Sequence, residues 1–83
     1  MVNRLFIFSA PWCQACKSYK HKLEESNIGF TEIDIEQEPS TAEAYNIVTL
    51  PTTIIESPEG KVMGKLEGAQ SPLTLKQVLK DLL

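Results

Sequence analysis

The pattern of apolar and polar positions along the chain begins with a strand and a helix. Leu5 to Phe8 is a continuous apolar run rich in aromatic and β-branched residues, which is typical of a central strand buried on both faces. Ser9-Ala10-Pro11 ends this strand. Apolar side chains then recur at three- and four-residue spacings, which predicts a helix ending near Ser26-Asn27, with its stripe formed by Trp12, Cys16, Tyr19 and Leu23.

A second strand and a second helix follow. Phe30 to Ile35 has the composition of a strand, and we expect it to run parallel to the first because strand, helix and strand in that order form a right-handed crossover. Pro39-Ser40 begins a short helix that fades near Asn46. This half of the chain therefore predicts a parallel pair of strands.

The last part of the chain predicts a hairpin and a final helix. Thr52 to Glu56 and Lys61 to Leu66 flank a segment with Pro at the second and Gly at the fourth position of a type I turn. Ser71 is a suitable N-cap and Pro72 a suitable first residue for a helix. The apolar stripe of that helix consists of Leu75, Val78, Leu79 and Leu82. The element order is therefore βαβαββα, in one α/β domain over residues 1–83.

The size and composition of the chain indicate a soluble, folded domain. Its 83 residues leave room for one domain with a radius of gyration of roughly 12 Å. The hydrophobic fraction of 42% is too high for a disordered chain, and no apolar run approaches the roughly 18 residues of a membrane span. We therefore expect no membrane association.

The charges are distributed unevenly around a net charge of −3. Residues 1–22 carry four basic side chains and no acidic one, residues 23–60 carry nine acidic side chains and no basic one, and residues 61–83 carry four basic and two acidic ones. This balance argues against a nucleic-acid binder that relies on overall positive charge. It predicts an acidic face, and a cationic region near Lys17, Lys20 and Lys22.

The two cysteines, Cys13 and Cys16, are the residues that point to chemistry. The apolar run before them is too short for a signal peptide, so we expect a cytoplasmic protein. A purely structural disulfide is disfavoured in that reducing compartment, and a close cysteine pair is there more often catalytic or metal-binding.

The predicted helix gives the two cysteines different environments. Cys13 lies near its N-terminus, where unpaired N–H groups and the helix dipole favour a thiolate, so we expect Cys13 to be a nucleophile. Cys16 lies on the apolar stripe, where it is placed to attack a mixed disulfide at Cys13. The alternatives are a zinc half-site and a pair of inert core cysteines. Structural zinc normally needs four ligands, and His21 is the only histidine, so we expect neither a metal nor a cofactor.

Four segments resemble the thioredoxin family in sequence and in order. Phe8-Ser9-Ala10-Pro11-Trp12-Cys13-Gln14-Ala15-Cys16-Lys17 resembles the active site, and the other three segments are Ile33 to Pro39, Tyr45 to Thr53, and Glu67-Gly68-Ala69. The resemblance spans residues 5–82 and implies a minimal thioredoxin fold. That fold has a mixed four-stranded sheet of order 2-1-3-4 with helices on both faces. We expect the first and third helices on one face, and the last two strands antiparallel to the first two.

The resemblance also implies a role for each site residue. Cys13 would be the attacking cysteine, Cys16 the resolving one, and Pro51 a cis-proline that places the backbone of the preceding residue beside the cysteines. An extended substrate would pair with that backbone by strand addition. The groove implied by the family is formed by Trp12, Thr49, Leu50, Pro51, Gly68 and Ala69.

One departure from the family pattern concerns proton transfer. Thioredoxins usually carry a buried Asp six residues before the attacking cysteine, where this chain has Ile7, and tend to have Lys where it has Glu32. Glu32 shares a strand face with Phe30, so it is placed to be a partly buried carboxylate behind Cys16. We hypothesise that Glu32 replaces the missing Asp as general base. An ordinary exposed glutamate on an edge strand is at least as good an interpretation.

The resemblance implies that the protein reduces disulfides in other proteins and is recharged by a flavoprotein thioredoxin reductase, as a monomer. Gln14-Ala15 lacks the histidine of oxidising members, which favours a reductase. An alternative is a glutaredoxin-like redoxin recharged by glutathione, or one dedicated to ribonucleotide reductase. Two alternatives from other classes are a non-catalytic binding module on the same fold, and a dimer bridged by zinc or an iron–sulfur cluster.

Overall fold

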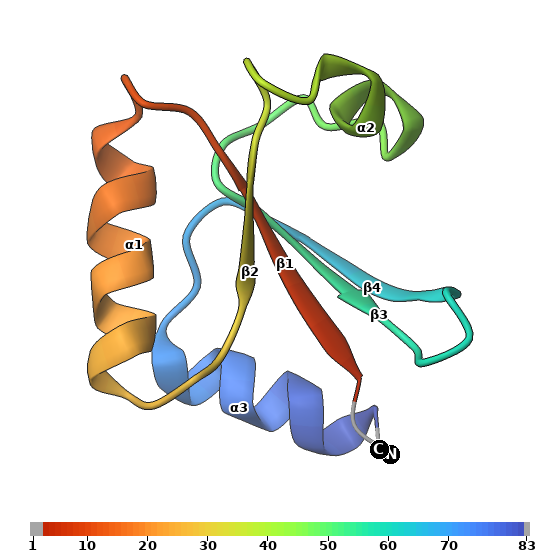
Figure 1. Ribbon diagram of the computed structural model, residues 1–83. Coiled ribbons are helices and arrows are strands. Elements are labelled where there is room, and N and C mark those ends of the chain that lie inside the picture. The colour runs from red at the N-terminus through yellow and green to blue at the C-terminus, as the bar shows by residue number, and fades with distance from the viewer. Residues whose placement is uncertain (1–2, 83) are drawn as a thin grey trace.

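A four-stranded sheet forms the centre of the molecule, with helices packed on both of its faces (Figure 1). The structure is a computed structural model that describes residues 3–82. The elements are β1 (Arg4–Ser9), α1 (Gln14–Glu25), β2 (Thr31–Asp34), α2 (Pro39–Ala44), β3 (Thr52–Glu56), β4 (Val62–Glu67) and α3 (Pro72–Asp81). The predicted order βαβαββα is confirmed, and the radius of gyration is 12.0 Å.

The strand order β2-β1-β3-β4 is the predicted one, but one predicted direction is wrong. β2 runs parallel to β1, and β3 runs antiparallel to β1. β4 is antiparallel to β3 and therefore runs parallel to β1, instead of antiparallel to it. The reason is the hairpin at residues 57–60, because a hairpin reverses the chain and its two strands cannot both oppose β1. Only β3 runs against the other strands.

Side-chain alternation along β1 supplies both layers of the core. Leu5 and Ile7 point to the face covered by α1 and α3, where they pack with Tyr19, Leu23 and Leu75. Phe8 points to the opposite face, where its neighbours are Ile33, Ile54 and the apolar side chains of α2 and the loop after it. The first and third helices therefore share a face, as predicted, and α2 covers the other (Figure 1).

The ends of several elements differ from the predicted ones by one or two residues. α1 ends at Glu25, and Asn27 continues the chain with φ of 59°. α2 ends at Ala44, two residues earlier than predicted, and is followed by Asn46 with φ of 54°. Asparagine adopts this left-handed conformation more readily than most residues, which explains why both helices end here.

None of the helices in residues 3–82 has the length and apolar character needed to cross a membrane.

Candidate redox site

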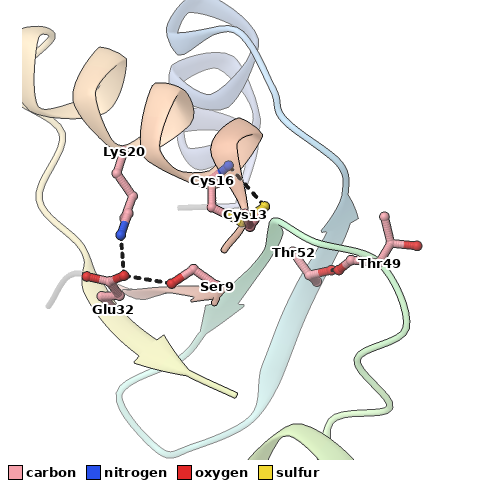
Figure 2. Close-up of a disulfide and its surroundings, with 7 residues drawn as sticks. All are labelled: Ser9, Cys13, Cys16, Lys20, Glu32, Thr49 and Thr52. Atoms are coloured by element: carbon pink, nitrogen blue, oxygen red, sulfur yellow. Dashed lines mark hydrogen bonds and ion pairs between the residues drawn. A yellow bond between two sulfur atoms is a disulfide. The ribbon is translucent and has the colours of Figure 1, made fainter. Parts of the chain in front are cut away.

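The two cysteines lie where β1 passes into α1, and the chain there is shaped by backbone hydrogen bonds. The amide of Cys13 donates to the carbonyl of Ala10 at 3.1 Å, which closes a turn after the strand. Cys13 is the N-cap of α1, with φ of −88° and ψ of 103°, and its Sγ accepts a hydrogen bond from the amide of Cys16 at 3.2 Å (Figure 2). Cys13 and Cys16 form a disulfide with their Cα atoms 5.3 Å apart.

The two cysteines differ in access to solvent. Cys13 is 9% exposed and Cys16 is 0% exposed, beneath the first turn of α1. Both pack against Ala10, and Ile35 and Leu50 contact this cluster from outside. Cys13 is therefore the more exposed residue of the pair, and the order of attack expected from the sequence stays a prediction.

The loops before β3 and after β4 bring two further predicted segments together. The Leu50–Pro51 peptide bond is cis, and Leu50 packs against the cluster that contains the cysteines. The carbonyl of Pro51 accepts a hydrogen bond from the amide of Gly68 at 2.8 Å. Gly68 has φ of +86°, a conformation that favours glycine. The backbone of Leu50, Pro51 and Gly68 is therefore gathered at one end of the sheet, where Leu50 borders the cluster that contains the cysteines.

Two other predicted groove residues lie at the exposed edges of these loops. Thr49 is exposed, and its carbonyl accepts a hydrogen bond from the hydroxyl of Thr52 (Figure 2). Ala69 is also exposed, and it lines a cavity of about 320 Å³ together with Ala15, Ser18 and Lys22 of the α1 segment. Ala69 therefore faces the helix that carries the cysteines.

Trp12 lies outside the helix, so its predicted place on the apolar stripe of α1 is wrong. Because Cys13 is the N-cap, the residue before it is in a turn, and the Trp12 side chain is 66% exposed. Its indole Nε1 donates a hydrogen bond to Oε2 of Glu36 at 3.0 Å. The ring is therefore tethered beside the disulfide by a carboxylate that the sequence pattern did not identify.

Glu32 is held in a polar network on the face covered by α1. Its Oε2 accepts hydrogen bonds from Ser9 Oγ at 2.6 Å and from Lys20 Nζ (Figure 2). The hydrogen bond from Lys20, and then that from Ser9, hold the pKa of Glu32 below its ordinary value. The side chain is 45% exposed, so the carboxylate is open to water on one side and hydrogen-bonded on the other, and its role as general base stays a hypothesis.

The position where the family usually has a buried Asp is apolar and is bordered by a neutral polar pair. Ile7 is fully buried and stands opposite Thr53 across the β1–β3 pair. The hydroxyls of Thr53 and Tyr19 are 2.7 Å apart, and burial raises the pKa of Tyr19. Neither hydroxyl is an anion at neutral pH, so this pair does not supply a carboxylate in place of the Asp.

The structure adds residues that the sequence patterns did not select. Ser9 and Glu36 lie in segments that resemble the family, but the sequence patterns gave neither residue a role in the site. Strand alternation, which can be read from the sequence, already places Ser9 on the same face as Ile7. Within residues 3–82, no group of three or more His, Cys, Asp or Glu side chains is arranged to hold a metal ion.

A family model described as Thioredoxin matches residues 2–81. The chain belongs to the thioredoxin family. It is 34% identical over 79 residues to the SPbeta prophage-derived thioredoxin-like protein YosR of Bacillus subtilis, which covers 95% of this chain and 98% of that protein. It is 32% identical over 82 residues to a thioredoxin of Staphylococcus epidermidis, covering 92% of this chain and 78% of that protein.

A solved thioredoxin structure agrees with the fold. The crystal structure of thioredoxin from Trypanosoma brucei brucei superposes with a TM-score of 0.85 at 28% identity, covering 98% of this chain and 74% of that one. Membership of the thioredoxin family and the Cys13–Cys16 pair together support protein disulfide oxidoreductase activity.

Proposed function

We propose that this protein reduces disulfides in other proteins, with Cys13 as nucleophile and Cys16 as resolving thiol. The observation that carries the proposal is the contrast at the start of α1: Cys13 is the N-cap and is 9% exposed, whereas Cys16 is fully buried. The amide of Cys16, directed at Cys13 Sγ, and the positive end of the helix dipole both stabilise a thiolate at Cys13.

The reaction consists of two exchange steps. The Cys13 thiolate attacks one sulfur of the substrate disulfide, a mixed disulfide forms, and the other substrate sulfur leaves as a thiolate. Cys16, once deprotonated, attacks Cys13 Sγ, and the second substrate sulfur leaves. The protein dithiol is oxidised to the Cys13–Cys16 disulfide, and the two electrons reside on the reduced substrate.

The loops beside Cys13 provide the substrate groove in this proposal. Leu50 is the residue before a cis-proline, and its backbone is placed for strand addition by an extended substrate segment. Trp12 offers an exposed aromatic face next to Cys13 in the chain, and Gly68, which is bonded to Pro51, has open space where a Cβ would lie, so a substrate backbone can approach it closely. Such main-chain recognition tolerates many substrate sequences.

We further propose that a flavoprotein thioredoxin reductase, in the cytoplasm, restores the dithiol. Support comes from the thioredoxin of Staphylococcus epidermidis, which aligns with 92% of this chain. The alternative donor is glutathione, and a direct comparison separates the two. The oxidised protein is incubated with NADPH and thioredoxin reductase, or with glutathione, and the appearance of free thiols is followed.

The test of the whole proposal is an insulin-reduction assay on the wild type and three variants. We expect activity in the wild type, loss of activity in Cys13→Ser, and accumulation of a mixed disulfide with insulin in Cys16→Ser. Ala44→Ser, an exposed substitution at the end of α2, is the control and should match the wild type. Activity that survives Cys13→Ser would contradict the mechanism.

A further inference from the structure

The proton of the Cys16 thiol has no direct route to solvent. Cys16 is 0% exposed and belongs to a buried cluster with Ala10 and Cys13, against which Ile35 and Leu50 pack. A thiol must lose its proton before it attacks a disulfide, because the thiolate is the nucleophile. A polar group near the first turn of α1 therefore has to take that proton or pass it on.

Ser9 and Glu32 connect this buried region to the surface. Ser9 is only 1% exposed and ends β1 on the face covered by α1, and in Figure 2 it lies between Glu32 and the turn that carries the cysteines. Its hydroxyl donates to Glu32 at 2.6 Å, which leaves the lone pairs of Ser9 Oγ free to accept a proton. Glu32 is half-exposed, so its carboxylate also meets water.

We propose that Ser9 and Glu32 form the exit route for the Cys16 proton, and that Lys20 holds the Glu32 carboxylate in place. The proposal rests on the proposed function, since it concerns the second exchange step. The Cys16 proton passes to Ser9 Oγ, directly or through one water molecule, while the Ser9 hydroxyl proton passes to Glu32. The Cys16 thiolate then breaks the mixed disulfide, and Glu32 releases its proton to solvent.

The charges around Glu32 make it an acceptor that is ionised at neutral pH. Lys20 faces it from α1 and Ser9 from β1, and their hydrogen bonds lower the pKa of Glu32. Lys17 lies one turn before Lys20 on the same side of α1, and Asp34 shares the strand face of Glu32. Removal of Lys20 therefore makes Glu32 a stronger base, because the largest cause of its low pKa is lost.

The Tyr19–Thr53 pair does not offer a second route. Both side chains are buried, and their hydroxyls bond to each other instead of leading outward. The raised pKa of Tyr19 also keeps its hydroxyl neutral, so the pair holds no anion that takes up a proton. The network of Ser9, Glu32 and Lys20 differs in having an ionised carboxylate at its outer end.

The test uses the reduced protein with excess 5,5′-dithiobis(2-nitrobenzoate) in stopped flow. The first release of thionitrobenzoate reports the bimolecular attack by Cys13, and the second reports the intramolecular attack by Cys16. We expect Glu32→Gln and Ser9→Ala to slow the second phase about tenfold at pH 7 and to leave the first unchanged. Ser9→Thr, which keeps a hydroxyl, and Glu25→Gln, an exposed carboxylate on α1, should both keep the wild-type rate.

The pH profile separates proton transfer from a structural role. In the wild type the second phase should vary little with pH wherever Glu32 is ionised, whereas in Glu32→Gln it should rise with pH as Cys16 itself ionises. Lys20→Met should move the acid limb of the profile to higher pH. A second-phase rate of Glu32→Gln that matches the wild-type rate over about pH 4 to 8 would overturn the proposal. An acid limb that stays at the wild-type pH in Lys20→Met would overturn it as well. Loss of the first phase would instead contradict the proposed function.

Discussion

The backbone amide of Cys16 donates a hydrogen bond to Sγ of Cys13 across 3.2 Å. This contact exists because Cys13 is the N-cap of α1 and Cys16 lies at the third helical position, where an N-cap side chain normally finds its donor. A sulfur atom here takes the place of the usual serine or aspartate oxygen. The helix terminus and the reactive sulfur are therefore parts of one local structure.

This geometry predicts selective alkylation of the reduced protein. Iodoacetamide at neutral pH should modify Cys13 roughly tenfold faster than a free cysteine, because the helix N-terminus stabilises its thiolate. Cys16 should react slowly because it is buried. Mass spectrometry of peptides after timed quenching measures both rates. A Cys13 rate equal to that of a free cysteine would favour a non-catalytic binding module.

A second prediction concerns the hydrogen bond between Trp12 and Glu36. Glu36→Ala removes the acceptor of the indole N–H and frees the ring, so the KM for a protein disulfide should rise several-fold while the rate with a small disulfide stays the same. Glu36→Gln keeps an acceptor oxygen and is the matched control. Equal KM values for Glu36→Ala and Glu36→Gln would show that the tether does not orient Trp12 for binding.

The buried pair of Tyr19 and Thr53 gives a third prediction, on stability. Tyr19→Phe and Thr53→Val each leave one buried hydroxyl unpaired, so each should lower the free energy of unfolding by about 1–3 kcal/mol. The double variant removes both hydroxyls and should cost about 1 kcal/mol less than the sum of the single variants. Urea denaturation of the four proteins completes the cycle. Strictly additive losses would mean that the two hydroxyls do not stabilise each other.

The two tyrosines give a fourth prediction, on alkaline pH. Burial raises the pKa of Tyr19, and the hydrogen bond to Glu56 is the main cause of the raised pKa of Tyr45. Each tyrosine has a folded-state pKa above its unfolded-state pKa of about 10. The stabilisation that the two neutral tyrosines contribute is therefore complete below about pH 10, and it is lost as pH rises through the folded-state pKa values. Ultraviolet titration should show both tyrosines ionising late. Tyr19→Phe should flatten the decline of the unfolding midpoint above about pH 10.

Two glycines provide a matched pair for the fifth prediction. Gly68 has φ of +86°, whereas Gly29 does not adopt a left-handed φ, and an added Cβ has no atom within 4 Å at either residue. Gly68→Ala should therefore destabilise the protein by about 1–2 kcal/mol through backbone strain alone. Gly29→Ala should be neutral or stabilising by up to about 1 kcal/mol. Thermal unfolding of both variants measures the difference, and equal effects would contradict this origin.

Local patterns predicted the elements well because each has its own physical signature in the sequence. The apolar run around Ile7 and Phe8 identified a strand buried on both faces, and Ser71-Pro72 identified the start of α3. The direction of β4 was predicted wrongly although the hairpin was recognised. That error came from combining correct local elements into a sheet, where the direction of a strand depends on every reversal before it.

The site was predicted less completely because side-chain pairing is not periodic. The spacing of Cys13 and Cys16 was visible in the sequence, whereas the bond from Trp12 to Glu36 joins residues that are 24 positions apart. Ser9 pairs with Glu32 only because β1 and β2 are adjacent and parallel, in a register that places Ile7 opposite Glu32. Such contacts depend on strand register, which a pattern of apolar residues specifies only in part.

The hydrogen bond from Gly68 to Pro51 has a consequence for biosynthesis. Cys13 leaves the ribosome before Gly68 and α3 do. A nascent polypeptide that has exposed both thiols still lacks the loop that completes the groove beside them. Because domains fold as units, the thiols become selective only after Gly68 and α3 have been synthesised, and before that stage they are ordinary cysteines open to unwanted exchange.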